Sequence, residues 1–268
     1  MNLLKYINSL PVSFTMKHYQ VFDAATPHMK NQALTSIESW EVLRTEHPFF
    51  SIPDTREEWL RTSEVKIKKD GQDNRLIERA KEVVDLLTRE QVTQVFSVGV
   101  GGAALEYQIK KAMPQVRMIC SDYSPQTVHV LKQVFTECDE IVQFDIEHDN
   151  WNTVQEEYLG EKGICLMYRV DAGVSDEAWH RIFRAMSKAG IKKILVIPTG
   201  ALTLLSIYNR KKRELKWLLK RVPVIWSGYV RTKKRFKGMW QLFYADLELS
   251  LGGLTSFLLT KKGVVSPH

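Results

Sequence analysis

The sequence has few cysteines and no long apolar run, and these two absences limit its class. Its 268 residues include three cysteines, Cys120, Cys138 and Cys165, at spacings unlike those of a zinc site. Two of them fall in predicted buried strands, where cysteine is a small core residue of a reducing compartment. No apolar stretch approaches the roughly 20 residues that span a bilayer. A secretory signal is also missing from the first residues, so we expect a cytoplasmic protein.

Acidic residues are fewer than basic ones, 31 against 38, which gives a net charge of +7. This excess favours anionic partners such as phosphates, nucleic acid or acidic lipid head groups. It is concentrated in the C-terminal third, where the basic run at residues 210–213 is followed by further lysines and arginines with leucines between them. A solvated helix face and a surface for anionic lipid or a phosphate-bearing acceptor both explain the pattern.

Internal repeats and low-complexity segments are also absent, and 44% hydrophobic with 26% charged residues is typical of a globular protein. The length fits one domain with an added cap, or at most two domains. Residues 1–72 lack strand alternation, so we predict a helical N-terminal cap with short amphipathic helices at residues 3–10, 33–43 and 55–63. The polar segment 68–74 is the expected boundary before a domain of residues 73–268.

From residue 76 onward, apolar strands alternate with amphipathic helices. Strands are predicted at residues 95–98, 116–120, 141–144, 164–168 and 191–197. Such units predict an α/β fold with a doubly wound, mostly parallel seven-stranded sheet and helices on both faces. Segments 224–233 and 239–247, joined by a polar turn at 234–238, are expected to form a C-terminal antiparallel hairpin.

The most informative stretch is QVFSVGVGGAALE at residues 94–106. A strand that breaks into glycines and restarts as a helix is typical of the nucleotide-binding entry of an open α/β sheet. Asp122 and Asp145 follow the next two strands, so all three segments should meet at one sheet edge. Asp122 stands where an acidic side chain can accept both ribose hydroxyls, although capping the helix at Pro125 is the structural alternative.

This ordered combination resembles the class I S-adenosylmethionine-dependent methyltransferases over about residues 75–250. Gly99 and Gly101 match the first motif, whereas Ser97 and Ala103 replace its acidic residue and its third glycine. The resemblance implies a Rossmann-like fold, S-adenosylmethionine as cofactor and methyl transfer by in-line displacement. It also implies a cofactor site made of Gly99, Val100, Gly101, Asp122, Tyr123, Asp145, Ile146 and Tyr168.

The acceptor is expected at the end of the fourth strand. There Asp171 could be a general base for a hydroxyl and Arg169 could hold an anionic acceptor, or the two could form a loop ion pair. The N-P-P-Y/F tetrapeptide of amino-methylating nucleic-acid enzymes is missing, so nucleic acid is the less expected acceptor. We predict O-methylation of a small-molecule, lipid-linked or glycan-linked acceptor. His180 is expected on the surface, and no residue cluster indicates a catalytic metal.

Two other functions remain open. Residues 99–104 also satisfy the G-x-G-x-x-A fingerprint of an NAD-dependent oxidoreductase, for which Asp122 would serve equally well. Asp145 and the hairpin are features that a dinucleotide site does not require. In the second alternative, the chain is a non-catalytic binding module that docks through its basic C-terminal third.

Overall fold

The computed structural model describes residues 12–21, 51–65, 75–222 and 224–263. In chain order the elements are β1 (Thr15–Val21), α3 (Arg56–Val65), α4 (Arg75–Arg89), β2 (Gln94–Val98), α5 (Ala104–Ala112), β3 (Arg117–Asp122), α6 (Pro125–Val134), β4 (Glu140–Gln143), α7 (Trp151–Thr153), η2 (Val154–Leu159), β5 (Gly163–Tyr168), α8 (Asp176–Lys188), β6 (Lys193–Ile197), β7 (Ala201–Leu202), α9 (Leu204–Leu219), β8 (Val224–Thr232), α10 (Lys233–Trp240), β9 (Tyr244–Leu251) and β10 (Leu254–Lys261). Within the described residues, no helix is long and apolar enough to cross a membrane.

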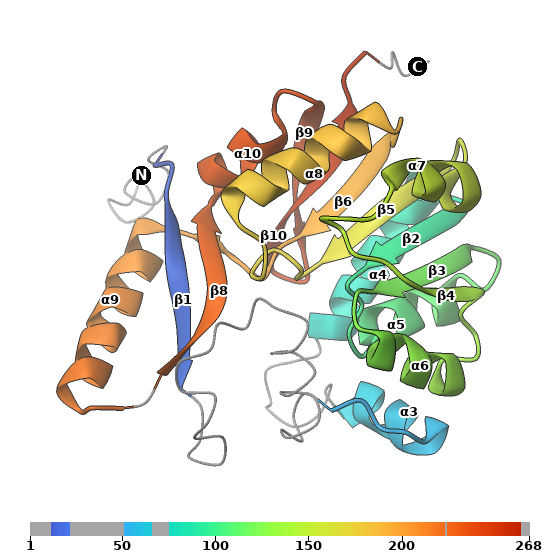
Figure 1. Ribbon diagram of the computed structural model, residues 1–268. Coiled ribbons are helices and arrows are strands. Elements are labelled where there is room, and N and C mark those ends of the chain that lie inside the picture. The colour runs from blue at the N-terminus through green and yellow to red at the C-terminus, as the bar shows by residue number, and fades with distance from the viewer. Residues whose placement is uncertain (1–11, 22–50, 66–74, 223, 264–268) are drawn as a thin grey trace.

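The main sheet has seven strands in the order β4-β3-β2-β5-β6-β10-β9 (Figure 1). All neighbours are parallel except β10, which is antiparallel to both β6 and β9. The predicted doubly wound, mostly parallel sheet with a C-terminal antiparallel hairpin is therefore confirmed. Because the chain winds from β2 out to β4 and then returns to β5, the strand order reverses between β2 and β5. In open α/β sheets, ligands bind at such a reversal, outside the carboxyl ends of the strands.

Side chains of the main sheet alternate between two buried faces, as the strand repeat of two requires. The face that contains Val95 packs against α4, α5 and α6. The face that contains Phe96 packs against α7, η2, α8 and α10. Cys120 and Cys165 lie on opposite faces, and both are fully buried and unpaired. They are the small core residues that the sequence predicts.

The hairpin is formed by β9 and β10, so the predicted strand positions were wrong. Residues 224–232 do form a strand, but this strand, β8, pairs with β1 outside the main sheet. The predicted polar turn at 234–238 belongs to α10. Phe236, Met239 and Trp240 recur at helical spacing there and bury one side of that helix. Lys234, Lys237 and Gly238 gave the segment its turn-like composition.

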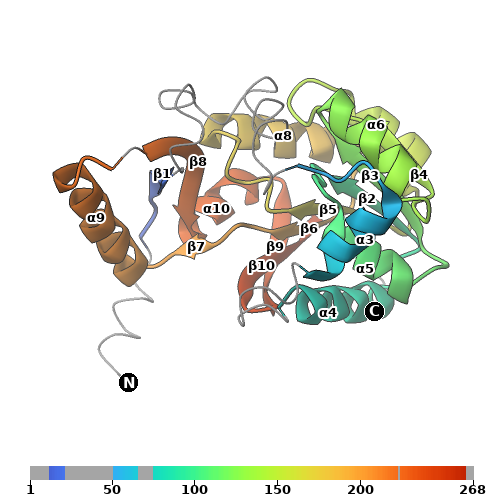
Figure 2. The same ribbon diagram turned by 90° about the horizontal axis from the view of Figure 1, so that it is seen from below.

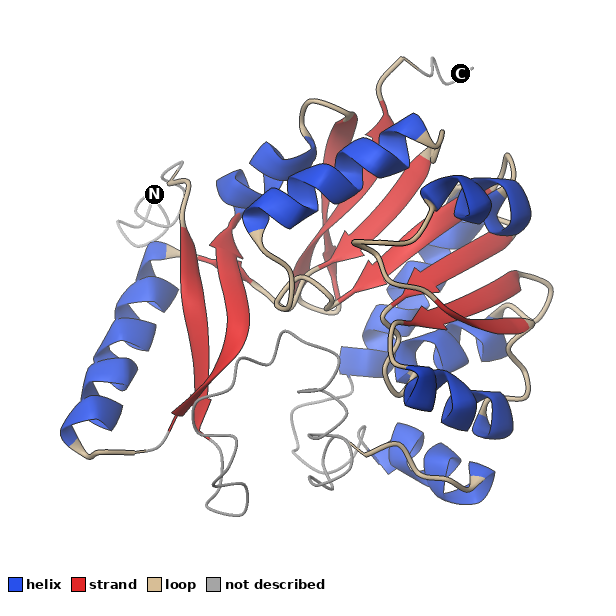
Figure 3. Cartoon of the chain, viewed as in Figure 1, coloured by secondary structure: helices blue, strands red, loops and turns tan. Residues whose placement is uncertain are grey.

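A second, three-stranded sheet has the order β1-β8-β7 and lies beside the main sheet with α9 on its outer side (Figures 1 and 3). The N-terminal part is therefore not wholly helical. Residues 56–65 form the predicted helix, but residues 15–21 form a strand that buries Met16 against Leu202 and Val230. The predicted helices at 3–10 and 33–43 lie outside the described residues, and the division at residue 72 stays a prediction.

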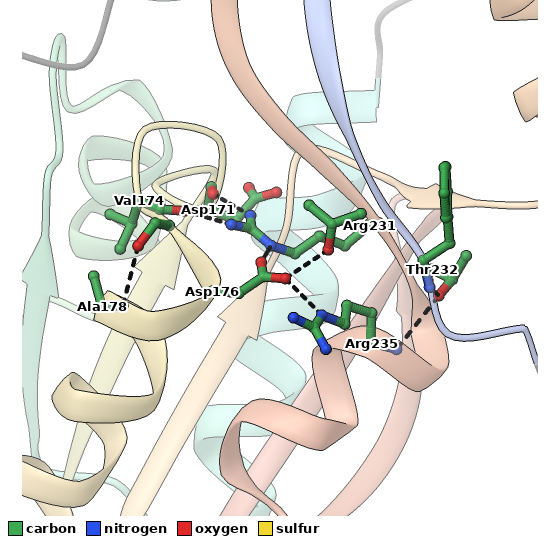
Figure 4. Close-up of polar contacts among 10 residues, drawn as sticks. Asp171, Val174, Asp176, Ala178, Arg231, Thr232 and Arg235 are labelled. Carbon is green, nitrogen blue, oxygen red and sulfur yellow. Dashed lines mark hydrogen bonds and ion pairs between the residues drawn. The ribbon is translucent and has the colours of Figure 1, made fainter.

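Buried Arg231 of β8 joins the small sheet to the loop between β5 and α8 (Figure 4). Its guanidinium donates to the Asp176 carboxylate at 2.6 Å and to the carbonyl oxygens of Asp171 and Val174. Three residues before Arg231, Gly228 has φ +113°, and an added Cβ would lie 2.0 Å from the Ala172 carbonyl oxygen. The small sheet therefore fixes residues 171–176 by close backbone approach as well as by the buried cation.

We expect Arg231→Met to lower the free energy of unfolding by about 3–5 kcal/mol. Removing one partner of a buried ion pair leaves the other charged and polar groups buried without a partner. Arg235→Met is the matched control, since Arg235 binds the same Asp176 carboxylate but is 43% exposed. That change should cost about 1 kcal/mol or less. Urea unfolding measures both values, and equal losses would contradict the anchoring role of Arg231.

Candidate cofactor site

The loop between β2 and α5, residues 99–103 and here called the glycine loop, depends on left-handed backbone conformations. Gly99, Gly101 and Ala103 have φ values of +63°, +53° and +53°. A Cβ at Gly99 would lie 2.5 Å from Val170 Cγ1, so glycine permits the close approach of the loop after β5. Ala103 takes the left-handed conformation without being glycine, at a cost of about 1–2 kcal/mol. Ala103 therefore has a backbone conformation that favours glycine, the residue that the family's motif has at this position.

Asp122 binds the glycine loop directly. One carboxylate oxygen accepts the Gly101 N–H at 3.0 Å and the other accepts the Ser124 N–H at 3.1 Å. The helix at Pro125 is capped by Ser124, whose hydroxyl accepts the Thr127 N–H, so Asp122 is not the cap. With 1% of its surface exposed, Asp122 ties the end of β3 to the loop after β2. Its contact with ribose hydroxyls stays a prediction.

The end of β4 lies beside the end of β3, where the Phe144 N–H donates to the Asp122 carbonyl oxygen at 3.1 Å. The Asp145 carboxylate accepts the Glu147 N–H and contacts the His148 ring at 2.9 Å, and this contact raises the pKa of His148. Ile146 is half-buried against the core of its sheet face. The sheet therefore brings the Asp145 segment and the Asp122 segment together as the sequence predicts.

Tyr123 is also half-buried, and its carbonyl oxygen accepts a hydrogen bond from Gln143 Nε2 at 3.2 Å. It follows Asp122 directly, so it lies at the same strand end. Val100 donates its N–H to the Ser121 carbonyl oxygen at 3.1 Å and accepts the Ala103 N–H at 2.8 Å. These backbone contacts fix the glycine loop between β2 and β3.

Ser97 occupies the position of the family's acidic residue, and a carboxylate reaches it from α5. Its hydroxyl donates to Glu106 Oε1 at 2.8 Å, and both side chains are buried. Burial raises the pKa of Glu106 from 4.5 to about 7, although the Ser97 hydrogen bond opposes this shift. The following helix therefore supplies a carboxyl group to the position in β2 that lacks an acidic residue.

Helix α3 contacts the glycine loop from the N-terminal side. The buried Trp59 indole donates its N–H to the Gly102 carbonyl oxygen at 3.0 Å. The ring packs against Tyr107 and Phe135, with centroid distances of 5.2 Å and 5.3 Å. Arg56, one turn earlier, pairs with Glu137 and holds α3 on α6. The structure therefore adds a loop contact from a segment for which the sequence predicted only a cap.

Tyr168, at the end of β5, is half-buried and bound to α4. Its hydroxyl accepts a hydrogen bond from Arg79 at 2.8 Å, and the guanidinium lies 5.5 Å from the ring centroid. Arg79 also donates to the carbonyl oxygens of Leu251 and Gly252. Tyr168 therefore takes part in the attachment of the β9–β10 turn to α4, and its predicted cofactor contact stays a prediction.

Arg169 and Asp171 follow Tyr168 but have different surroundings. Arg169 is exposed and has the left-handed φ of +60°, which is uncommon for a side chain of this size. Asp171 is 1% exposed, and its Oδ1 accepts hydrogen bonds from the Thr199 N–H and hydroxyl at 2.7 Å and 2.9 Å. Burial raises the pKa of Asp171. Among the described residues the two do not form an ion pair, so the alternative of a loop ion pair is wrong.

Sequence reasoning missed Trp59, Arg79, Glu106 and Arg231. Only Glu106 had a local signal, since it stands between apolar residues at the start of α5, close to the strand that lacks its acidic residue. The other three act on segments far away along the chain. His180, expected on the surface, is half-buried with its ring 5.2 Å from that of Phe243.

Comparisons with known proteins identify the fold. No protein-family model matches the sequence, and no curated protein matches it. Human N-acetylserotonin methyltransferase in complex with S-adenosylmethionine aligns at 18% identity and a TM-score of 0.52, over 88% of this chain and 64% of that chain. The pyocyanin biosynthetic protein PhzM aligns at 15% identity and 0.51, over 89% and 77% of the two chains. PigF with S-adenosylhomocysteine aligns at 13% and 0.50, over 83% and 73%.

The chain therefore has the Rossmann-like fold of class I S-adenosylmethionine-dependent methyltransferases, as the resemblance implied. It spans 64% of the length of the human enzyme. At identities of 13–18% the likeness shows the fold alone.

The raised pKa of Glu106 predicts a specific pH dependence of stability. Below pH 4.5 the carboxyl is protonated in both states, and between pH 4.5 and about 7 only the folded state keeps the proton. Stability from this group is therefore lost as pH rises through about 7. Glu106→Gln keeps an acceptor for Ser97 but cannot ionise. Between pH 5 and pH 8, the wild type should lose about 2–3 kcal/mol of unfolding free energy relative to this variant. Parallel urea titrations with the same pH dependence would contradict the assignment.

Proposed function

We propose that the protein is a methyltransferase that binds S-adenosylmethionine over the glycine loop. The main support is the arrangement of three adjacent strand ends, which brings the glycine loop, Asp122 and Asp145 to the point of strand-order reversal. Human N-acetylserotonin methyltransferase, which shares the fold, was solved with S-adenosylmethionine. The antiparallel β10 between β6 and β9 favours this function over the nicotinamide-dependent alternative, because a dinucleotide site requires no antiparallel strand.

The residues of the site suit the parts of this cofactor. A Cβ built at Gly102 meets nothing within 4 Å, so the glycine loop borders open space there. Asp122 and Tyr123 would hold the ribose and border the adenine, and Asp145 with Ile146 would contact the adenine edge and face. Gly99, Val100 and Gly101 would approach the amino-acid part, with Tyr168 at the end of the neighbouring strand. When bound, the sulfonium group supplies an activated methyl group.

The acceptor is proposed to lie at the end of β5. Arg169 presents an exposed guanidinium beside the loop that contacts Gly99 through Val170, so it suits an anionic acceptor. Holding donor and acceptor in line can lower the barrier by about 7–11 kcal/mol in favourable cases. We infer an oxygen acceptor on a small, lipid-linked or glycan-linked molecule. Asp171 is buried, so it could act as a general base only if residues 169–176 opened, and its catalytic role stays a prediction. The cytoplasmic location also stays a prediction.

Asp122→Asn should weaken binding of S-adenosylhomocysteine by about 1.5–3 kcal/mol, because the ribose hydroxyls and the Gly101 N–H lose a charged acceptor. Asp85→Asn, on the exposed side of α4, makes the same charge change away from the site and should leave Kd unchanged. Titration calorimetry with S-adenosylhomocysteine and with NADH measures both. Heat of binding from NADH and none from S-adenosylhomocysteine would favour the oxidoreductase.

Trp59→Phe should raise the Kd for S-adenosylhomocysteine about three- to tenfold, because a net hydrogen bond of about 0.5–1.5 kcal/mol to Gly102 is lost. Tyr107→Phe is the control, since it changes the same aromatic cluster but keeps the hydrogen bond from the residue 107 N–H to the Ala103 carbonyl oxygen of the glycine loop. A Trp59→Phe variant with lower stability but unchanged Kd would show that the indole only packs α3.

A further inference from the structure

We propose that the outer face of α9 binds the anionic surface of a lipid bilayer. Helix α9 has 16 residues, and none of them is buried. It lies at the outer end of the molecule, beyond β1 and β8, in both views of the ribbon (Figures 1 and 2). A helix with no buried residue gains little from packing, so its solvent-facing composition indicates what it contacts.

The side of α9 toward the small sheet mixes apolar and polar side chains, since its half-buried residues are Leu204, Ser206, Ile207, Arg210, Glu214 and Trp217. Ile207 contacts the cluster of Met16, Leu202 and Val230. Arg210, three residues on, contacts His18 Nδ1 at 2.7 Å, and burial together with this cation lowers the pKa of His18 to about 4. The inward side therefore holds a cation against a neutral imidazole among its half-buried apolar residues, and the helix keeps further leucines in solvent.

Further apolar side chains point into solvent. Tyr208, Leu215 and Leu219 follow one another at spacings of seven and four residues, which places them on one side of the helix. Their exposed fractions are 63%, 57% and 76%, and Leu218 beside them is 74% exposed. Leu205 extends the same side by one turn. Single exposed leucines are ordinary, but Leu215, Leu218 and Leu219 are three and four residues apart and form one contiguous exposed group, which indicates an interaction site.

Basic residues lie within and beside this stripe, since Lys212 falls between Tyr208 and Leu215 and the positions of Lys216 and Lys220 follow one edge. Lys212, Lys216 and Lys220 are exposed and lie within or just beyond α9, and none of them forms a salt bridge within the described residues. The acidic residue of the helix, Glu214, is paired with Lys211 at 2.7 Å. Exposed leucines with unpaired lysines beside them are typical of helices that lie in a membrane interface, where leucines enter the acyl boundary and lysines meet anionic head groups.

Other partners suit this face less well. A second copy docked on the same face through a two-fold axis would place like-charged lysines against each other. Nucleic acid would neutralise the lysines, but its phosphates would leave the leucines without an apolar partner. An anionic lipid surface satisfies both kinds of side chain at once.

The surface is coupled to the proposed acceptor position. Helix α9 is followed by β8, whose Arg231 and Gly228 hold residues 171–176 after β5. A protein docked through α9 would therefore hold this loop at a fixed position relative to the bilayer. The docking proposal itself does not depend on methyl transfer.

Co-sedimentation with phosphatidylcholine vesicles, with and without phosphatidylglycerol, tests the proposal. We expect binding to the phosphatidylglycerol vesicles at low ionic strength and release at high salt, because exposed charges act over about 8 Å at physiological salt. Each lysine near an anionic surface contributes about fivefold, so Lys212→Gln, Lys216→Gln and Lys220→Gln together should lower the partition coefficient about a hundredfold. Leu218→Ser with Leu219→Ser should lower it at least about tenfold at unchanged charge.

The matched control is the triple change Lys81→Gln, Lys132→Gln and Lys188→Gln, which removes the same charge from exposed positions on α4, α6 and α8. It should keep vesicle binding. No binding of the wild type to the anionic vesicles, or equal loss in both triple variants, would overturn the proposal. So would vesicle binding that the serine variants leave unchanged, or a leucine-dependent dimer in place of vesicle binding. All variants should bind S-adenosylhomocysteine like the wild type, which separates this test from that of the cofactor site.

Discussion

The hydrogen bond from the Gly101 N–H to the Asp122 carboxylate is the contact on which the candidate site depends. It connects the loop after β2 with the end of β3, and the Ser124 N–H fixes the other carboxylate oxygen. A left-handed glycine alone would leave this loop many conformations. The buried Asp122 carboxylate accepts two backbone N–H groups and thereby selects one conformation of the loop. The loop is therefore ordered before any ligand binds.

Three further groups support the same loop from different sides. Trp59 donates to the Gly102 carbonyl oxygen, Glu106 accepts from Ser97 in the strand that leads into the loop, and Val170 lies close to Gly99. These groups come from α3, α5 and the segment after β5. The N-terminal part of the chain is thus built into the site, and the segment after β5 is in turn held by Arg231 of β8. Contacts therefore connect the glycine loop with the expected acceptor position and, through β8, with α9.

Much of this fold could be predicted because its information is local. Continuous apolar strands such as the one around Phe96, a glycine turn and the Ser175 helix cap each act within a few residues. The errors have physical causes as well. Lysines and Gly238 gave α10 the composition of a turn, although its apolar residues have helical spacing, and β1 is stabilised by pairing with the distant β8. The position of Asp122 was predictable, but the hydrogen bonds of its carboxylate, and those of Trp59 and Arg231, depend on tertiary contacts.

A crystal structure of the protein with S-adenosylhomocysteine tests the central claim most directly. We expect the ligand to bind across the ends of β2, β3 and β4. Its ribose hydroxyls should lie at Asp122, its adenine beside Asp145 and its amino-acid part over Gly99 to Gly101. Ligand bound elsewhere on the chain, or a glycine loop that binds only the pyrophosphate of a nicotinamide dinucleotide, would contradict it.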